Sequence, residues 1–396
     1  MAHSVSLPGH LAASSQDIAS EKAVRVPWYI WNFALAATSA TIGGTWDISW
    51  HASIGRDTFW TPAHMAIYLC GLLAGFGSAY LILDTTFGSG RLRAASVRMW
   101  GFRGPLGAFL ATWGAVAMLA SAPFDDWWHN AYGLDVKILS PPHSILIFGI
   151  VAIKFGALLL ALGAMNRASG ALRARLEWVF LYVGALMARD MVGVFLEYLS
   201  RNQMHSARYY LVVSLTAPLG LTAVARASRH RWGTTIVAAI LTVLGLGFLW
   251  ILPLFPAEPK LGPVYRQVTH FIPVGGFPML LLAPALALDL LRRRAEPWNR
   301  WKLALAGGAL FLGTFLAVQW PFASFLQSPA ARNWVFGAHY LPYFVPARND
   351  VTLGVFTAIE KTPAEFWTRM ALAAVAAVLS VRLGLAWGEG MRRIRR

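Results

Sequence analysis

The sequence predicts an all-α fold, a polytopic integral membrane helical bundle. Of the 396 residues, 57% are hydrophobic and only 13% are charged, about half the charged share of a soluble domain. Apolar runs near 20 residues, the length that a helix needs to cross a bilayer, recur along the chain. Basic residues also concentrate in alternate connections between these runs. These observations exclude an ordinary cytosolic globule, a disordered chain and a secreted disulfide scaffold.

Ten apolar runs predict about ten transmembrane helices. The single cysteine, Cys70, lies inside one of these runs, which excludes a cysteine-based metal site. The expected spans are 28–46, 62–83, 104–122, 142–165, 177–198, 207–225, 233–254, 272–291, 303–320 and 366–388.

The distribution of basic residues predicts the orientation of these spans. One set of alternating connections, with both termini, holds 21 Lys and Arg, whereas the other set holds 9. Because the more basic connections face the cytoplasm, we expect a plasma (inner) membrane protein with both termini cytoplasmic. The net charge of +16 then reflects topology and contact with the lipid bilayer, and no nucleic acid partner is expected.

This orientation divides the chain into four parts. A polar cytoplasmic tail covers residues 1–26, and a basic cytoplasmic tail covers 391–396. Between them we expect a duplicated four-helix membrane unit at 27–165 and a six-helix membrane unit at 166–390. The second unit includes two exoplasmic loops, at 255–271 and 321–365.

An internal repeat supports the duplication, because the same residue types recur about 78 positions apart. Each copy is expected to form a helical hairpin, built from helices 1 and 2 in the first copy and helices 3 and 4 in the second. The shared residues are Asp47, His51, Gly55, Asp57, Pro62 and His64 in the first copy, and Asp125, His129, Gly133, Asp135, Pro141 and His143 in the second.

The spacing within each copy predicts where the polar side chains lie. Asp47 and His51 stand four residues apart, so they share one helix face if the first helix extends that far; Asp125 and His129 repeat this spacing. A Thr-Pro or Ser-Pro pair then predicts an N-cap and a first helical residue. The final histidine of each copy thereby becomes the third residue of the next helix, where the helix dipole favours neutral imidazole, the metal-binding form.

These residues predict a transition-metal site on the exoplasmic face, in a pocket shared by both hairpins. A histidine and carboxylate set without thiolate suits copper, zinc, non-haem iron or manganese, and the exoplasmic position favours copper over iron or zinc. The candidate ligands are His51, His64, His129, His143, Asp57, Asp125 and Asp135. Candidates for orienting ligands or carrying protons are Asp47, Asp126, Arg189, Asp190 and Glu197. A structural network of hydrogen bonds and ion pairs is the alternative interpretation of the same residues.

Haem ligation is less favoured. Paired histidines 13 or 14 residues apart can hold two haems on one continuous helix, but here charged residues and prolines separate them. Pro62 lies between His51 and His64, for example.

The predicted function is that of a metal-dependent oxidoreductase, a copper or non-haem-iron oxygenase acting on a small or hydrophobic substrate. Partner subunits or a redox protein would bind on the exoplasmic side. Two other functions remain open: a transporter or permease, suggested by the charged residues Lys154, Arg189 and Asp190 inside spans, and a non-catalytic subunit of a respiratory or assembly complex. A phosphate-binding glycine loop, a nucleophile elbow and an HExxH sequence are absent from the chain.

Overall fold

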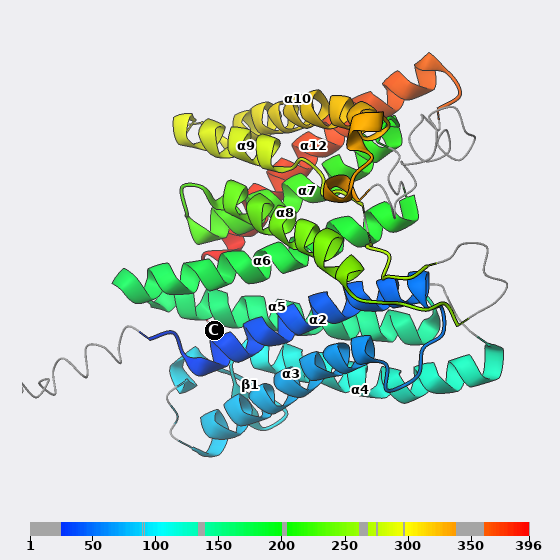
Figure 1. Cartoon of the computed structure of the whole chain (residues 1–396). Helices are drawn as coiled ribbons and strands as arrows, with labels where there is room; N and C mark the ends of the chain where they lie inside the picture. Colours follow the sequence, from blue (N-terminus) through cyan, green and yellow to red (C-terminus); the bar gives the residue numbers. More distant parts are fainter. Residues whose placement is uncertain are drawn as a thin grey trace, which may run out of the picture.

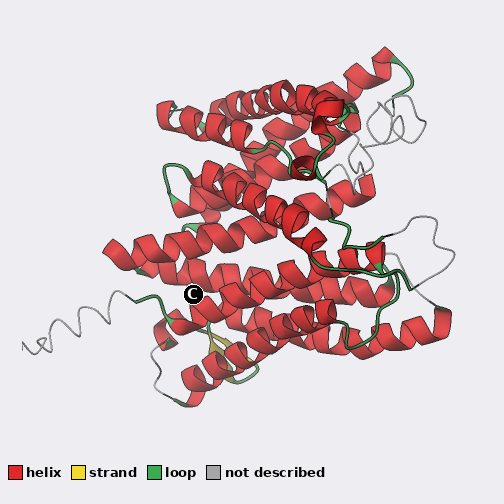
Figure 2. Cartoon of the chain, in the orientation of Figure 1, coloured by secondary structure: helices red, strands yellow, loops and turns green. Residues whose placement is uncertain are grey.

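The computed structural model describes residues 25–88, 90, 92–133, 139–199, 204–260, 268–274, 276–295, 298–337 and 360–395. This part of the chain is a helical bundle with ten α-helices (Figures 1 and 2). Eight of them are long and apolar enough to cross a membrane, which confirms the predicted fold class. The helices are α2 (Trp28–Ser53), α3 (Pro62–Phe87), α4 (Leu106–Tyr132), α5 (Pro141–Arg167), α6 (Gly170–Leu199), α7 (Ala207–Ser228), α8 (Gly233–Ile251), α9 (Leu282–Arg294), α10 (Arg300–Leu326) and α12 (Pro363–Met391).

The two copies of the repeat form two helical hairpins, α2–α3 and α4–α5. Helices α4 and α5 approach closely because glycines face each other: a Cβ atom on Gly114 would stand 2.6 Å from the carbonyl oxygen of Gly149. Gly107 and Gly156 repeat this contact. Small residues at helix interfaces are a common way for membrane helices to pack without a hydrophobic driving force.

The remaining helices form the other half of the bundle, in which α12 packs along α7 and α10 (Figure 1). Here one predicted span is wrong in extent. The span expected at 272–291 is helical only from Leu282, and the residues described from 268 to 281 precede the helix without regular structure. Pro273 and Pro278 explain the late start, since proline lacks the amide hydrogen that a helix interior needs.

Both ends of the described chain lie at the same end of the bundle. Tyr29, near the start of α2, senses the charge of Arg167 at the end of α5. Asn166, next to Arg167, donates hydrogen bonds to the carbonyl groups of Met391 and Ile394 at the end of α12. We call this the basic end, and it includes Arg93, Arg98, Arg103, Arg167, Arg226, Arg292 and Arg392.

A short β-hairpin that the sequence analysis did not predict also lies at the basic end. Strands β1 (Val97–Met99) and β2 (Phe102–Gly104) are antiparallel and join α3 to α4. Trp100 and Gly101 form the connecting turn, both with positive φ, as a two-residue hairpin turn requires. A strand pair of three residues each is too short to leave a clear alternating pattern.

Large apolar side chains cover the outside of the helices. Phe76 and Phe148, for example, are each more than 70% exposed although they lie in the middle of long apolar helices. Exposure on this scale would be unfavourable in water and fits contact with lipid. The described chain is therefore a membrane protein.

Candidate metal centre

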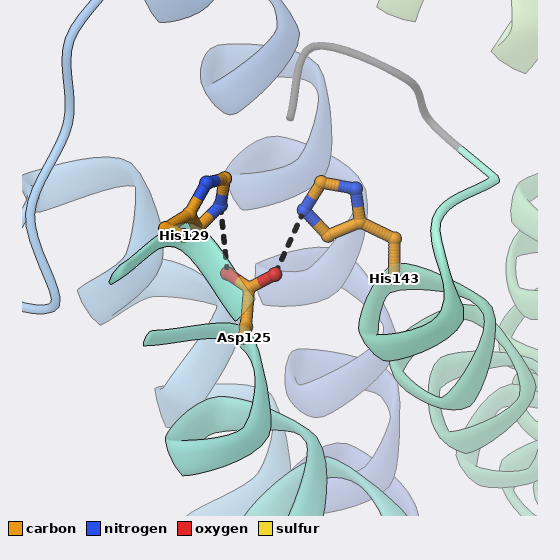
Figure 3. Close-up of side chains that lie close together, drawn as sticks. All are labelled: Asp125, His129 and His143. Carbon is orange, nitrogen blue, oxygen red and sulfur yellow. Dashed lines mark ion pairs between the residues drawn. The ribbon is translucent and has the colours of Figure 1, made fainter. Parts of the chain in front are cut away.

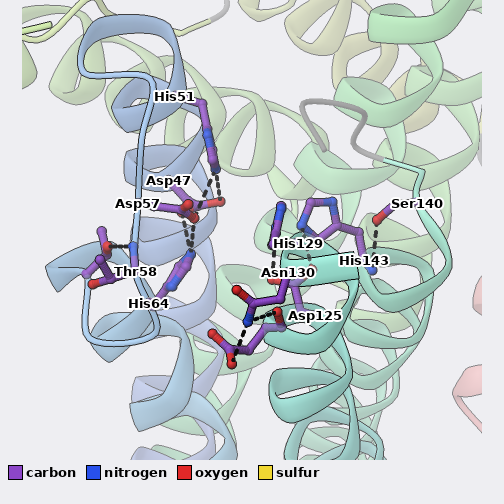
Figure 4. A network of polar contacts seen from close by, with 12 residues as sticks. Asp47, His51, Asp57, Thr58, His64, Asp125, His129, Asn130, Ser140 and His143 are labelled. Atoms are coloured by element: carbon purple, nitrogen blue, oxygen red, sulfur yellow. Dashed lines mark hydrogen bonds and ion pairs between the residues drawn. The ribbon is translucent and has the colours of Figure 1, made fainter. Parts of the chain in front are cut away.

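The first polar group of the repeat lies at the end of the bundle opposite the basic end. Asp47 and His51 project from the last turns of α2, Asp57 comes from the connection, and His64 comes from the first turn of α3 (Figure 4). His64 Nε2 stands 3.1 Å from Asp47 Oδ1 and 3.2 Å from Asp57 Oδ2. His51 Nε2 stands 3.4 Å from Asp57 Oδ2 and 3.9 Å from Asp47 Oδ2. We call these four residues the first set.

The second polar group belongs to the other hairpin. Asp125 and His129 come from the last turns of α4, and His143 comes from the first turn of α5 (Figure 3). Asp125 Oδ2 stands 3.5 Å from His129 Nε2, and Asp125 Oδ1 stands 3.3 Å from His143 Nε2. We call these three residues the second set.

The two sets repeat one arrangement atom by atom. In each, the aspartate of the first helix directs Oδ2 toward the histidine four residues later and Oδ1 toward the histidine of the second helix. Asp47 and Asp125 are therefore equivalent bridging residues. The sequence analysis named Asp47 only as a residue that orients ligands, but its position equals that of the candidate ligand Asp125.

The local sequence explains why the histidines point inward. As predicted, α3 begins at Pro62 and α5 at Pro141, so His64 and His143 are each the third helical residue. The Ser140 hydroxyl accepts a hydrogen bond from the His143 backbone amide, which makes Ser140 a true N-cap. The Thr61 hydroxyl does not cap its helix and instead accepts a hydrogen bond from the Thr58 amide, which fixes the connection.

The separations within each set match those of ligands around one metal ion. Ligand atoms held about 2.0–2.1 Å from a tetrahedral metal stand about 3.3–3.4 Å apart. All but one of the six histidine-to-carboxylate separations fall between 3.1 and 3.5 Å. Ligand atoms of Asp47, Asp57 and His64 lie within 4.8 Å of one another, and so do those of Asp125, His129 and His143.

The hydrogen bonding inside the sets is incomplete for groups so close together. Asp47 Oδ1 and Asp125 Oδ1 are buried and make no hydrogen bond among the described residues, although each lies near an imidazole. The buried Nδ1 of His64 also makes none. Buried polar atoms are normally paired, and here Asp47 Oδ1 and Asp125 Oδ1 are paired through ion-pair contacts with imidazoles at 3.1 and 3.3 Å. This arrangement fits both a bound cation and a structural network.

The local electrostatics keep the carboxyl group of Asp57, in the connection between α2 and α3, ionised. Burial alone raises the pKa of the Asp57 carboxyl, but His51 and His64 outweigh this effect and hold the pKa well below its usual range. Asp57 is thus a carboxylate at neutral pH, held so by the charges of the two imidazoles. A metal ion bound here would take the place of the imidazole protons.

The expectation of one shared pocket needs correction. Each set is complete within its own hairpin, so the geometry gives two neighbouring groups of candidate ligands (Figure 4). They are close enough to interact, because Asp125 senses the charges of His64 and Asp57. A hairpin brings its own residues together through one short connection, whereas sharing a pocket would require ligands to cross between hairpins.

Tyr68 is a residue near both sets that the sequence analysis missed. It lies one turn after His64 on α3, with ring centroids 6.1 Å apart, and it senses Asp47 and Asp57 of the first set as well as Asp125 of the second. Its four-residue spacing from His64 could have indicated this position, but the repeat could not, because the second copy has Ile147 there.

The other candidates lie apart from both sets or outside the described residues. Asp126 is exposed and its carboxylate accepts a hydrogen bond from Asn130, away from the second set. Asp190 forms an ion pair with Lys154, and Arg189 donates a hydrogen bond to Thr45. Asp135 lies outside the described residues, as does the side chain of Glu197.

Comparison with known proteins gives no relative from which a function could be transferred. No protein-family model matches the chain, and neither a curated protein nor a solved structure matches it. The function is therefore argued from the two sets themselves.

Proposed function

We propose that the protein is an integral-membrane, metal-dependent oxidoreductase that holds a transition-metal ion in each of the two sets. The observation that supports this most directly is the repeated geometry: two hairpins present the same histidine and aspartate atoms at the separations expected of metal ligands. A single cluster of this kind is often structural, but two equivalent clusters favour a common function, which we propose is metal binding.

We favour copper over iron or zinc as the bound metal. Imidazole nitrogen and carboxylate oxygen without thiolate suit copper(II) and non-haem iron, and the proposed exoplasmic position favours copper. A redox-active ion held by three or four protein ligands can keep a position open for oxygen or for a substrate. We therefore propose the oxygenase class of membrane oxidoreductases for this protein.

The residues have distinct roles in this proposal. The four histidines supply nitrogen ligands, and Asp57 supplies a carboxylate that is ionised at neutral pH. Asp47 and Asp125 each hold two imidazoles in position and are close enough to bind the ion themselves. Electron-donating partners would reach the sets from the exoplasmic side, the side opposite the basic end.

Metal analysis of single variants tests the proposal. Wild-type protein should retain about two copper ions per chain, and His64→Ala or His143→Ala should lower this to about one, because each removes ligands from one set only. Oxygen uptake by the copper-loaded protein with a quinol as electron donor should fall in both variants.

The matched control is His205→Gln, which alters a histidine that contacts Trp320 and Ser324 outside the sets. This variant should keep both metal ions. Metal content unchanged by every replacement within the sets would contradict metal binding there. Metal binding without oxygen uptake would instead contradict the oxidoreductase function alone.

A transporter is the second candidate, and two observations favour it. The non-helical residues before α9 and the charged side chains of Lys154 and Asp190 resemble the broken helices and buried charges of many carriers. A transporter predicts that Asp190→Asn abolishes solute flux in vesicles while the metal content stays intact.

A further inference from the structure

A second charged cluster lies inside the bundle, on the other side of α2 from the first set. Lys154 of α5 is 1% exposed, contacts Asp190 of α6 and donates a hydrogen bond of 2.8 Å to the Thr41 hydroxyl. Arg189 of α6 donates a hydrogen bond of 2.8 Å to the Thr45 hydroxyl. Thr41 and Thr45 lie one turn apart on α2, so both cations approach the same helix face.

The cluster has two cations and one carboxylate. Asp190 is in close contact with the Lys154 ammonium, whereas the Arg189 guanidinium stands 3.7 Å from it without a hydrogen bond. Among the described residues, Asp190 is the acid that lies within ion-pair distance of Arg189. Among the side chains that the structure describes, one positive charge is therefore left without a matching anion in this part of the bundle.

This excess charge belongs to Arg189. A guanidinium does not lose its proton in proteins, so Arg189 cannot become neutral to relieve the imbalance. Charged groups within membrane helices are costly unless they are paired. The threonine hydroxyls supply hydrogen bonds but no negative charge.

The side chain of Arg189 is only partly covered by its neighbours. Its side chain is 29% exposed, and its guanidinium lies 5.1 Å from the ring centroid of Phe248 on α8. Helix α8 is the least buried of the long apolar helices. The partly exposed guanidinium therefore lies between the Thr45 hydroxyl of α2 and the Phe248 ring of α8.

We propose that the exposed part of the Arg189 guanidinium binds the carboxylate group of a small organic monoanion. A guanidinium presents two parallel N–H donors that match the two oxygens of a carboxylate. One monoanion neutralises the excess charge, and Phe248 offers an apolar surface to the organic part of the ligand. Thr45 and Asp190 hold the guanidinium in place from the other side.

This proposal does not depend on the metal sets, and the experiment keeps the two apart. Binding of benzoate and acetate to purified, metal-free protein is measured by calorimetry and by the shift in melting temperature, with chloride as the comparison anion. We expect saturable binding of both carboxylates, tighter for benzoate, and none for chloride at the same concentration. The same result is expected for His64→Ala protein.

Variants locate the site. Arg189→Gln should weaken benzoate binding by about tenfold or more, since it removes charge-assisted hydrogen bonds. The matched control is Arg382→Gln, which changes another arginine of a long apolar helix, one that lies over Trp301, and it should bind benzoate as the wild type does. Phe248→Ala keeps the charge and should weaken benzoate more than acetate, so the proposal stays testable even if Arg189→Gln does not fold.

Three results would overturn the proposal. The first is wild-type protein that shows no saturable carboxylate binding, which would mean that Lys154 is neutral and Arg189 pairs with Asp190. The second is equal binding by wild-type and Arg189→Gln protein. The third is a response to chloride equal to that for carboxylates, which would reflect charge screening instead of a site.

Discussion

At the scale of single residues, the two bridging aspartates orient the histidines of both sets. Asp125 directs one oxygen to each histidine of its set, and Asp47 does the same in the other hairpin. A carboxylate that holds two imidazoles sets both their orientation and their charge. Replacing it therefore affects more than one ligand.

Asp125→Asn should remove the metal ion of the second set and leave the first set loaded. The amide keeps the size of the side chain but loses the negative charge that both imidazoles face. Total bound metal should fall by about half, to about one ion per chain, as measured by elemental analysis of purified protein.

The neighbouring residue provides the control for this prediction. Asp126→Asn makes the same chemical change one position later, on a side chain that is exposed and bonded to Asn130. It should keep the full metal content. Equal loss in both variants would show that general charge at this end, and not the bridging geometry, retains the metal.

The sequence predicted those residue positions that depend on local spacing. Helical periodicity placed Asp47 beside His51, and the proline pairs fixed the starts of α3 and α5. It could not predict that Lys154 pairs with Asp190, because 36 residues and a helix packing contact separate them. The sequence also suggested a single metal pocket shared by both hairpins. Residue spacing within one hairpin does not show how two hairpins are placed relative to each other.

At the scale of elements, the close contact of α4 and α5 positions the second set. His143 meets Asp125 only if the two helices remain near each other along their length. The sequence located these helices within a few residues but did not single out the glycines that let them approach. Gly114 and Gly149 matter because each lies against the backbone of the partner helix.

Gly114→Ala should destabilise the protein by about 1–3 kcal/mol, the usual cost of overpacking. Its Cβ atom would stand 2.6 Å from the Gly149 carbonyl oxygen, so the helices must separate. Thermal unfolding in detergent measures the loss, and the second set should bind metal more weakly. Gly313→Ala, where a Cβ atom would meet nothing within 4 Å, should change neither property.

A second prediction at this scale concerns the contact between α7 and α12. The buried Glu360 carboxylate accepts hydrogen bonds from Ser206 and from the Arg208 amide at the start of α7, and from Arg369 of α12. Burial raises the pKa of Glu360, but these hydrogen bonds outweigh it and lower the pKa below its usual value. The ionised form therefore stabilises the folded protein.

Because the pKa is lowered on folding, the stabilisation by Glu360 is complete well above the unfolded value of about 4.3 and is lost as the pH falls through the folded value. Glu360→Gln should lower stability at neutral pH by about 1.5–3 kcal/mol. The difference from wild type should shrink as the pH is lowered below about 4. A difference that stays constant with pH would show that the carboxylate charge is not responsible.

At the scale of the whole molecule, the bundle has two chemically different ends. Arginines gather where α2 begins and α12 ends, and the histidine and aspartate sets lie at the opposite end. The alternation of basic residues along the sequence predicted this division. The alternation is a sum over many side chains, so it does not depend on the exact position of any one of them. The sequence did not predict that α9 is short, because the residues before Leu282 are as apolar as those of a membrane helix.

The proposed orientation can be tested with introduced thiols, because the native Cys70 is buried. Trp60→Cys places a thiol at an exposed position beside the first set, and Ser169→Cys places one between α5 and α6 at the basic end. In right-side-out vesicles, a membrane-impermeant maleimide should label the first and spare the second. The reverse pattern would place the two sets on the cytoplasmic side.

We propose above that the two sets are equivalent metal sites, and a crystal structure can test this. Crystals grown with copper and measured at the copper absorption edge test this most directly, since the anomalous difference map locates each ion independently of the protein atoms. Two peaks, one within about 2.0–2.2 Å of the ligand atoms of each set, are the predicted result. A map without a peak at either set, from crystals whose copper lies elsewhere, would contradict the account.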